Sequence, residues 1–314
     1  MLIEQKLIKR IKKKQDKEAA NALILYYYKE IYAYVYRQTG NEELAKDLTQ
    51  DIFIQILQKM TAEFVTKAKG EIMRFEADTH SHTLASGHAY STIKEMAAAA
   101  EAKGLKALAL TEHAPKMPGT CGLFYFQNLD VVPRKCGGIR LLMGAEVNIM
   151  DETGRIDLPE STCRDLDIVI ASIHPPCYGM GHTEEENMRA YEAVMKKPYI
   201  NIIGHPDDGR FQIDYERLVK MAKETGTLLE VNNSSMRPSS SRKGTRENIL
   251  TMLDLCKQYD VPVTTGSDAH VDVDAGNFTY VKEVLKFCDF PEELVVTTKF
   301  DVLKQYLNMN TFGM

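Results

Sequence analysis

From residue 73 onward, short apolar segments alternate with amphipathic helices, and this alternation constrains the fold more than any other feature of the chain. The apolar segments are FEADTHSH (75–82), LKALALTEH (105–113), IRLLMGAEVNI (139–149), LDIVIASIHPP (166–176), YINIIGHPD (199–207), TLLEVNNSS (227–235) and VPVTTGSDAH (261–270). Short apolar strands separated by helices indicate an α/β fold with a parallel sheet that is buried on both faces. Seven such units favour a β/α barrel over an open sheet, although the periodicity is compatible with both.

The helices between these segments have recognisable ends. In STIKEMAAAAEAKG (91–104), Thr92 and Glu95 have the spacing of a capping box, and Gly104 is typical of a helix end. The segments 183–197 and 214–226 follow the same pattern. We therefore predict a helix in each of these connections.

The first 60 residues are predicted to form helices of a different kind. Leu44, Leu48, Ile52 and Ile56 recur every four residues, which predicts one apolar helix face. Gly40 and Asn41 separate this helix from a tyrosine-rich one, and Asn41 is its expected N-cap.

The charge distribution indicates two modules. Residues 1–70 contain 13 Lys/Arg and 9 Asp/Glu, a balance of +4, whereas the whole chain has a net charge of −5 and the remainder therefore −9. Six of the 15 tyrosines lie between Tyr26 and Tyr36. We predict a small all-helical segment over 1–65, a linker over 66–72 and an α/β domain over 73–314.

The composition is that of a soluble, cytoplasmic protein. The chain is 44% hydrophobic and 26% charged, and no apolar run approaches the roughly 20 residues needed to cross a bilayer. The basic N-terminus lacks the apolar core of a signal peptide. Six cysteines are scattered without a CxxC pair, which favours reduced thiols in a cytoplasm over disulfides. We expect no membrane partner.

Seven of the eight histidines occur at the end of a predicted strand or just after it. They are His80, His82, His88, His113, His174, His205 and His270, and the carboxylates Glu146 and Asp268 share this placement. The carboxyl ends of parallel strands meet on one face, so these nine side chains are expected to converge. Imidazoles with carboxylates suit zinc, manganese or iron(II), and nine ligands exceed the needs of one ion. The pattern predicts a multinuclear metal centre.

A histidine at a strand end is, taken singly, more often a core or hydrogen-bonding residue than a metal ligand. The shared placement of seven histidines argues against that alternative for the group. His182, in the loop GMGHTEEEN, is the exception, and we expect it at a helix start or on the surface.

Seven motifs resemble, in order and spacing, those of the PHP (polymerase and histidinol phosphatase) metal-dependent phosphoesterases, and in particular the YcdX-type bacterial phosphatases. They are DTHSHTLASGHAYST (78–92), LTEHAP (110–115), GAEVNI (144–149), ASIHPP (171–176), IIGHPD (202–207), EVNNSS (230–235) and GSDAH (266–270). The resemblance covers about 73–310. It implies a distorted seven-stranded, TIM-like β/α barrel that hydrolyses phosphate monoesters.

The resemblance also implies a cluster of three divalent metal ions, zinc before manganese or iron. The first ion would be held by His80, His82, Glu146 and Asp268. The second would share Glu146 and be completed by His174 and His205, and the third would be held by His88, His113 and His270. Glu146, Asp268 and His270 would take part in catalysis. Histidinol-phosphate phosphatase is the alternative within enzymes. A PHP exonuclease is disfavoured because the barrel segment has a charge of −9.

Metal chemistry needs no protein nucleophile, and the chain has neither a GxSxG nor a CxxxxxR motif. Arg242 and Lys243, just before a predicted helix, are candidates to bind the phosphate or the leaving group; a solvated loop is the alternative. Three further residues, Asn232, Asn233 and Ser234, are expected to orient ligands and not to bind metal. The apolar surroundings of Cys177 favour an inert thiol.

Residues 20–60 resemble the first half of region 2 of an extracytoplasmic-function sigma factor, most clearly in TGNEELAKDLTQDIF (39–53). The resemblance implies RNA polymerase as a partner, and in one alternative the whole chain is a transcription-associated module. The aromatic and basic helices that would melt promoter DNA do not follow, so DNA binding is not expected. The other alternative is a generic helical hairpin.

Overall fold

The computed structural model describes residues 17–65 and 73–308, with side chains over 22–53 and 73–308. Two compact units are present, Met1–Ile72 and Met73–Met314. The predicted linker, 66–72, lies outside the described residues. No helix among the residues described combines the length and apolarity needed to cross a bilayer.

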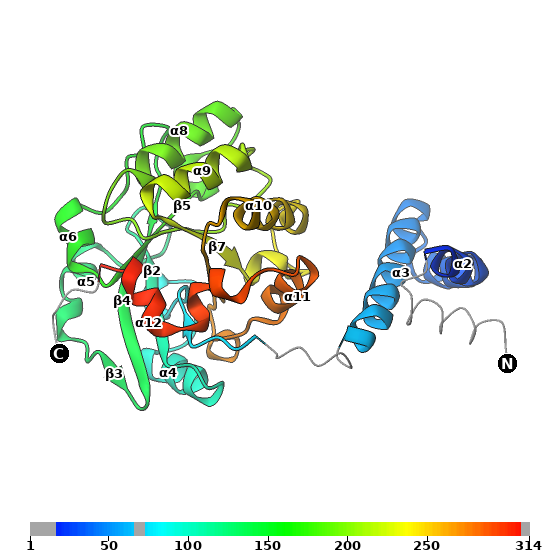
Figure 1. Ribbon diagram of the computed structural model, residues 1–314, viewed down its shortest axis with the longest axis horizontal. Coiled ribbons are helices and arrows are strands. Elements are labelled where there is room, and N and C mark those ends of the chain that lie inside the picture. The colour runs from blue at the N-terminus through cyan, green and yellow to red at the C-terminus, as the bar shows by residue number, and fades with distance from the viewer. Residues whose placement is uncertain (1–16, 66–72, 309–314) are drawn as a thin grey trace. The chain divides into compact units, whose positions relative to one another are not determined.

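The first unit contains two helices, α2 (Lys17–Thr39) and α3 (Glu42–Val65) (Figure 1). They are separated where the sequence predicted, at Gly40, which has a φ of +62°. The side chain of Asn41 caps α3, since its Oδ1 accepts a hydrogen bond from the backbone N–H of Leu44 at 3.1 Å.

The buried face of α3 differs from the predicted one. Ala45, Thr49 and Phe53 are buried, whereas Leu44 and Leu48 are 47% and 38% exposed. Ala45 leaves room for close approach, and the Thr49 hydroxyl is satisfied by donating to the carbonyl of Ala45 at 2.6 Å. The ring of Phe53 stacks on Tyr28 of α2, with centroids 6.2 Å apart. The contact between α2 and α3 therefore uses the row Ala45, Thr49 and Phe53 instead of the predicted row that begins at Leu44. Ile52 is half-buried, and the side chain of Ile56 lies outside the described residues.

The second unit is a nearly closed barrel of seven parallel strands, which confirms the predicted fold. In order around the sheet, the strands are β1 (Ala77–Asp78), β2 (Ala107–His113), β4 (Ile139–Asn148), β5 (Ile168–Ser172), β6 (Ile202–Ile203), β7 (Leu228–Asn232) and β8 (Val263–Gly266). One further strand, β3 (Lys135–Cys136), was not predicted and pairs antiparallel with β4. The ring is completed by a parallel bridge between Ser81 and Ala269 instead of a regular ladder.

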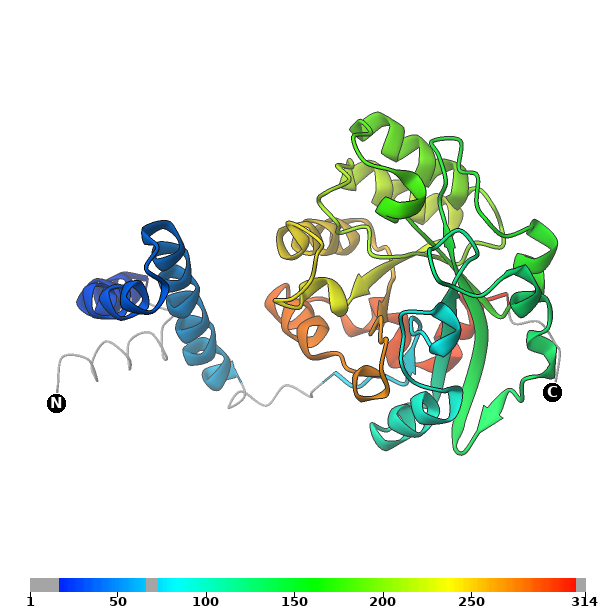
Figure 2. The same ribbon diagram turned by 180° about the vertical axis from the view of Figure 1, so that it is seen from behind.

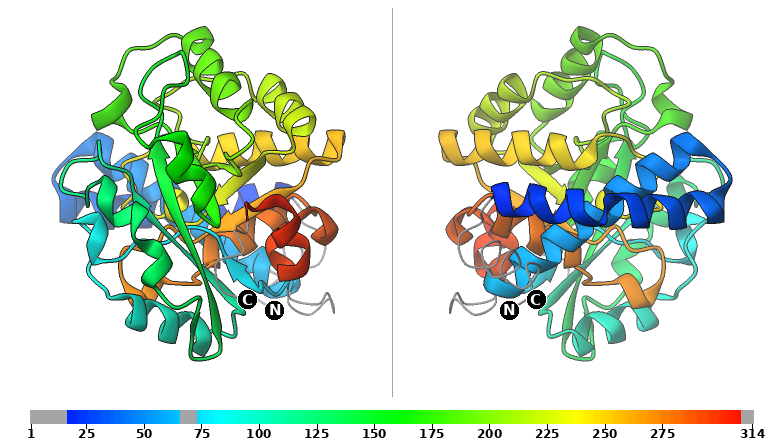
Figure 3. Two further views of the ribbon diagram at one scale, coloured as in Figure 1. Left: turned by 90° about the vertical axis from the view of Figure 1, so that its left-hand side faces the viewer. Right: turned by 90° about the vertical axis from the view of Figure 1, so that its right-hand side faces the viewer.

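Helices surround the strands, as Figures 1, 2 and 3 show from different sides. They are α4 (Ile93–Ala102), α5 (Leu123–Gln127), α6 (Glu160–Asp165), α7 (Pro175–Tyr178), α8 (Glu184–Met195), α9 (Tyr215–Thr225), α10 (Thr245–Tyr259), α11 (Thr279–Phe287) and α12 (Phe300–Leu303). Short 3-10 turns are η1 (Leu84–Ser86), η2 (Leu129–Val131), η3 (Ser234–Met236), η4 (Asp272–Asp274), η5 (Glu292–Leu294), η6 (Val296–Thr298) and η7 (Lys304–Tyr306).

The helix ends follow the predicted signals. Thr92 and Glu95 form a full capping box at α4, and Thr183 with Glu186 forms another at α8. At α9, Asp214 caps the first turn, and the chain leaves the last turn in a left-handed conformation at a glycine.

Strand alternation separates two apolar layers. In β2, Leu108 and Leu110 belong to the large core between strands and helices, whereas Ala107 and Ala109 belong to a smaller inner cluster. Leu303 of α12 packs in that inner cluster. Apolar side chains therefore fill one end of the barrel, while polar side chains occupy the inner positions toward the carboxyl ends of the strands.

Candidate metal centre

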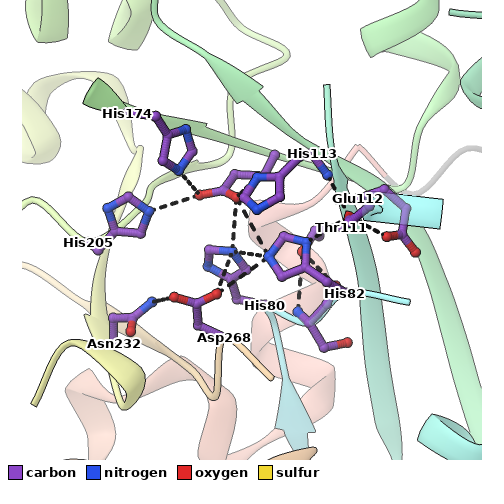
Figure 4. A network of polar contacts seen from close by, with 12 residues as sticks. His80, His82, Thr111, Glu112, His113, His174, His205, Asn232 and Asp268 are labelled. Carbon is purple, nitrogen blue, oxygen red and sulfur yellow. Dashed lines mark hydrogen bonds and ion pairs between the residues drawn. The ribbon is translucent and has the colours of Figure 1, made fainter. Parts of the chain in front are cut away.

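The nine predicted ligands come together at the carboxyl ends of the strands. Figure 4 labels His80, His82, His113, His174, His205 and Asp268 of this group. Glu146 is fully buried and points inward like Leu142, four residues earlier in β4. The β2–β4 register places His113 directly beside Glu146. Parallel pairing thus brings residues of distant segments to one point.

The two oxygens of Glu146 face different groups of histidines. Its Oε1 lies 2.9 Å from Nε2 of His205 and 3.2 Å from Nε2 of His174. Its Oε2 lies 2.7 Å from Nδ1 of His113 and 3.4 Å from Nε2 of His80. A carboxylate in this position can bridge two cations.

Asp268 completes a second group with His80 and His82. Its Oδ1 lies 3.4 Å from Nε2 of His82 and 3.7 Å from Nε2 of His80, and these two nitrogens are 3.1 Å apart. The ligand atoms of this group all lie within 4.8 Å of one another.

Two further groups share His113. One combines it with Glu146 and His174, and the other with His82 and His270, again with ligand atoms within 4.8 Å. His88 is exposed and joins through its ring, whose centroid is 4.8 Å from that of His113 and 4.9 Å from that of His270.

Two of these residues have a left-handed backbone. His205 has a φ of +31° and Asp268 a φ of +52°, and residues other than glycine rarely adopt such backbone angles. Such conformations cost free energy and persist where the surroundings hold them, often at functional sites.

Burial and neighbouring charges set the ionisation of the cluster. Burial opposes the charge of Glu146, but His174, His80 and His113 outweigh it and hold its pKa well below the usual value. For Asp268, burial is likewise outweighed, chiefly by His80 and Arg242, and its pKa is well below the usual value. Both carboxylates are therefore anionic at neutral pH.

The histidines do not all respond alike. Burial, followed by the charges of His113 and His270, lowers the pKa of His82 well below its usual value. Burial also lowers the pKa of His174, despite Glu146. At His80, burial acts in the same direction, but Glu230, Glu146 and Asp268 together raise its pKa well above the usual value. His82 thus favours the neutral form that a metal ligand needs.

Two buried atoms fit a cation. Nδ1 of His113 and Oε2 of Glu146 are inaccessible to solvent and make no hydrogen bond, although they lie only 2.7 Å apart. A cation bound by both atoms would satisfy them together. The donor set, imidazole and carboxylate, suits zinc or a similar divalent ion.

Glu230 is a supporting residue that the sequence analysis missed. It is fully buried, its Oε1 lies 2.8 Å from Nδ1 of His80, and its Oε2 accepts the backbone N–H of His205 at 2.8 Å. A side chain at Gly266 would meet Oε1 of Glu230 at 2.1 Å, so the glycine leaves the room it needs. It could have been predicted from the alternation of side chains along a strand, because Glu230 and Asn232 are two residues apart in β7 and therefore point to the same face.

Other polar residues hold the histidine rings. Asn148 Oδ1 lies 2.8 Å from Nδ1 of His174. Ser86 Oγ lies 3.2 Å from Nδ1 of His82 and donates to Glu112 at 2.6 Å. These contacts fix ring orientation.

The residues Asn232, Asn233 and Ser234, at the end of β7 and just after it, have different contacts. Asn232 donates to Asp268 at 3.3 Å, as expected of an orienting residue, and Ser234 lines the cavity above the cluster. Asn233 does not reach the cluster; its Oδ1 accepts the backbone N–H of Tyr280, in the first turn of α11, at 2.9 Å.

The two predicted phosphate-binding residues are separated. Arg242 lines the cavity and donates to Asp268 at 3.0 Å and to Ser235 at 3.0 Å. The side chain of Lys243 is exposed and is not among the described residues that line this cavity. The cavity has a volume of about 510 Å³.

Cys177 and His182 stand apart from the cluster. Burial raises the pKa of Cys177 to about 11, which disfavours the reactive thiolate. His182 precedes α8 and packs its ring on Tyr178, with centroids 4.2 Å apart.

The sequence is similar to a known protein family and to named bacterial proteins. Residues 78–234 match the family model described as the PHP domain. A probable phosphatase of Thermoanaerobacter sp. (strain X514) is 46% identical over 235 residues, which is 75% of this chain and 95% of that protein. A probable phosphatase of Clostridium novyi (strain NT) is 47% identical over 75% of this chain and 95% of that protein. About a quarter of this chain has no counterpart in these alignments.

Among solved structures, one distant likeness is the histidinol phosphate phosphatase of Lactococcus lactis, crystallised with zinc, L-histidinol and phosphate. It aligns with a TM-score of 0.49 and 18% identity, covering 69% of this chain and 94% of that chain.

Proposed function

The chain belongs to the PHP-domain family and is a phosphatase, and from this premise we propose that it hydrolyses phosphate monoesters of small molecules at a centre of three divalent metal ions. The observation that carries the proposal is the division of Glu146, whose Oε1 faces His174 and His205 while its Oε2 faces His113 and His80. One carboxylate between two sets of imidazoles suits more than one cation.

We assign the ligands as the motifs suggest. The first ion would be held by His80, His82, Glu146 and Asp268, the second by Glu146, His174 and His205, and the third by His88, His113 and His270. Zinc suits this donor set best, with manganese and iron(II) as alternatives.

Cations held there supply Lewis acidity, which neutralises the charge of a phosphate ester and lowers the pKa of water from 15.7 toward about 7. Arg242 is placed to donate to phosphate oxygens at the edge of the cluster, since it already lies 3.0 Å from Asp268. Asn232 keeps Asp268 oriented at 3.3 Å. The products are an alcohol and inorganic phosphate, and no serine or cysteine nucleophile is needed.

Elemental analysis tests the metal centre. Purified, metal-replete protein should hold close to three transition-metal ions per chain and release phosphate from a panel of monoesters. Chelation should abolish turnover, and added zinc or manganese should restore it. One ion or fewer per chain would refute the trinuclear assignment.

A second candidate concerns the helical unit. Leu25, Tyr26, Tyr34 and Leu44 are between 47% and 77% exposed, which leaves apolar surface for a partner within this unit. Together with the sigma-factor resemblance, this supports RNA polymerase as that partner. Purified core polymerase should then retain the full chain but not a chain beginning at Lys69. We propose a location in the cytoplasm, where RNA polymerase acts.

A further inference from the structure

One wall of the cavity is not used by the proposed metal chemistry. It is lined by Arg210, Arg237 and the serines Ser239, Ser240 and Ser241. These residues come from the loops before α9 and before α10. The wall brings guanidinium and hydroxyl groups into the cavity that also contains the proposed metal ligands.

Both arginines are held in place and retain unused donors. Arg210 donates to Asp208 through Nε at 2.9 Å and Nη2 at 2.6 Å, and its Nη1 makes no hydrogen bond or ion pair with the described residues. Arg237 contacts Asp274 through Nη2 at 2.8 Å. A guanidinium carries five N–H donors in a fixed fork, so each arginine can still bind an oxyanion.

Among the described residues, no free carboxylate lines this cavity. The acidic side chains that line the cavity are Asp208 and Asp268. Asp208 is bound by Arg210 on both oxygens, and Asp268 is bound by Arg242 and faces the metal cluster. An ammonium group in the leaving group would therefore find no free carboxylate, whereas an oxyanion would find guanidinium donors.

We propose that the preferred substrate carries a second oxyanion, a carboxylate or another phosphate, and that Arg210 and Arg237 bind it. This inference rests on the proposed phosphatase activity and names its substrate class. It disfavours histidinol phosphate, whose leaving group carries an ammonium.

Calorimetry with two non-hydrolysable probes tests the subsite without turnover. The probes are 3-phosphonopropionate and propylphosphonate, which differ in a terminal carboxylate. Metal-replete wild-type protein should bind the first at least tenfold more tightly. Arg237→Gln should reduce that ratio toward one, and Arg210→Lys, which keeps the charge beside the buried Asp208 but not the fork, should reduce it in part. Arg189→Gln, on the exposed surface of α8, should retain the wild-type ratio.

Turnover of matched esters separates this inference from the proposed function. The kcat/KM should be at least tenfold higher for 3-phosphoglycerate than for glycerol 3-phosphate, and lowest for phosphoethanolamine. Arg237→Gln should lower the ratio of the first two mainly through KM. Turnover without preference, or preference for the ammonium ester, would overturn the inference alone. No turnover of any ester would overturn the proposed function and the inference with it.

Discussion

At the scale of single residues, Glu146 has the most demanding position in the cluster. It is fully buried, yet histidines on both sides hold its pKa far below the usual value and keep it anionic. A buried anion without a nearby positive charge is strongly destabilising, so the charge of Glu146 requires the histidines or cations around it.

Glu146→Ala and Asp268→Ala should each abolish phosphate release and reduce the bound metal, because each removes an anion that compensates cations. Turnover and elemental analysis of the purified variants measure both effects. His182→Ala is the control and should remain active, since its ring packs on Tyr178 outside the cluster. Near-native rates in either carboxylate variant would show the ligand assignment to be wrong.

Glu230→Gln should weaken metal binding by about 10–100-fold, the usual effect of losing a residue that orients a ligand. The amide cannot at once accept from His80 and from the backbone N–H of His205, so one of these contacts is lost. Competition with a chelator measures the affinity. The exposed Glu216→Gln is the matched control, and equal affinities in the two variants would rule out the positioning role.

At the scale of elements, the barrel is assembled from strands of very unequal length. β1 and β6 have two residues each, whereas β4 has ten and supplies Glu146. β6 ends at Ile203 and β8 at Gly266, before the left-handed turns at His205 and Asp268, which a continued ladder would forbid. The early ends of these strands thus help to place His205 and Asp268 in the cluster.

Thr92→Ala should lower the free energy of unfolding of the barrel by about 1 kcal/mol, because it removes the side chain that caps α4. Urea denaturation followed by circular dichroism measures the change. Thr251→Ala, in the middle of α10 with an exposed side chain, should change stability little, since alanine favours the helix interior. Equal effects at the two positions would contradict a capping role.

At the scale of the whole molecule, the chain consists of two compact units, Met1–Ile72 and Met73–Met314. Every proposed ligand belongs to the second, which also contains the complete ring of seven parallel strands. The helical unit therefore contributes no residue to the proposed chemistry.

Removal of the helical unit should leave turnover of small phosphate esters nearly unchanged. The kinetic constants of the full chain and of a chain beginning at Lys69 test this. A loss beyond about tenfold, or roughly 1.4 kcal/mol of transition-state stabilisation, would mean that the helices support the active site. Far-ultraviolet circular dichroism of the shortened chain controls for misfolding.

The sequence by itself determined the alternation of strands and helices, the helix ends at Thr92 and Asp214, and the convergence of the histidines. These follow from local periodicity and from the rule that parallel strands end on one face. Only the tertiary structure decided which oxygen of Glu146 faces which histidines, and that Glu230 lies behind His80. It also buried Phe53 and left Leu44 exposed. Periodicity states whether a side chain points inward, but contacts across many residues depend on register, barrel closure and packing, which no local pattern contains.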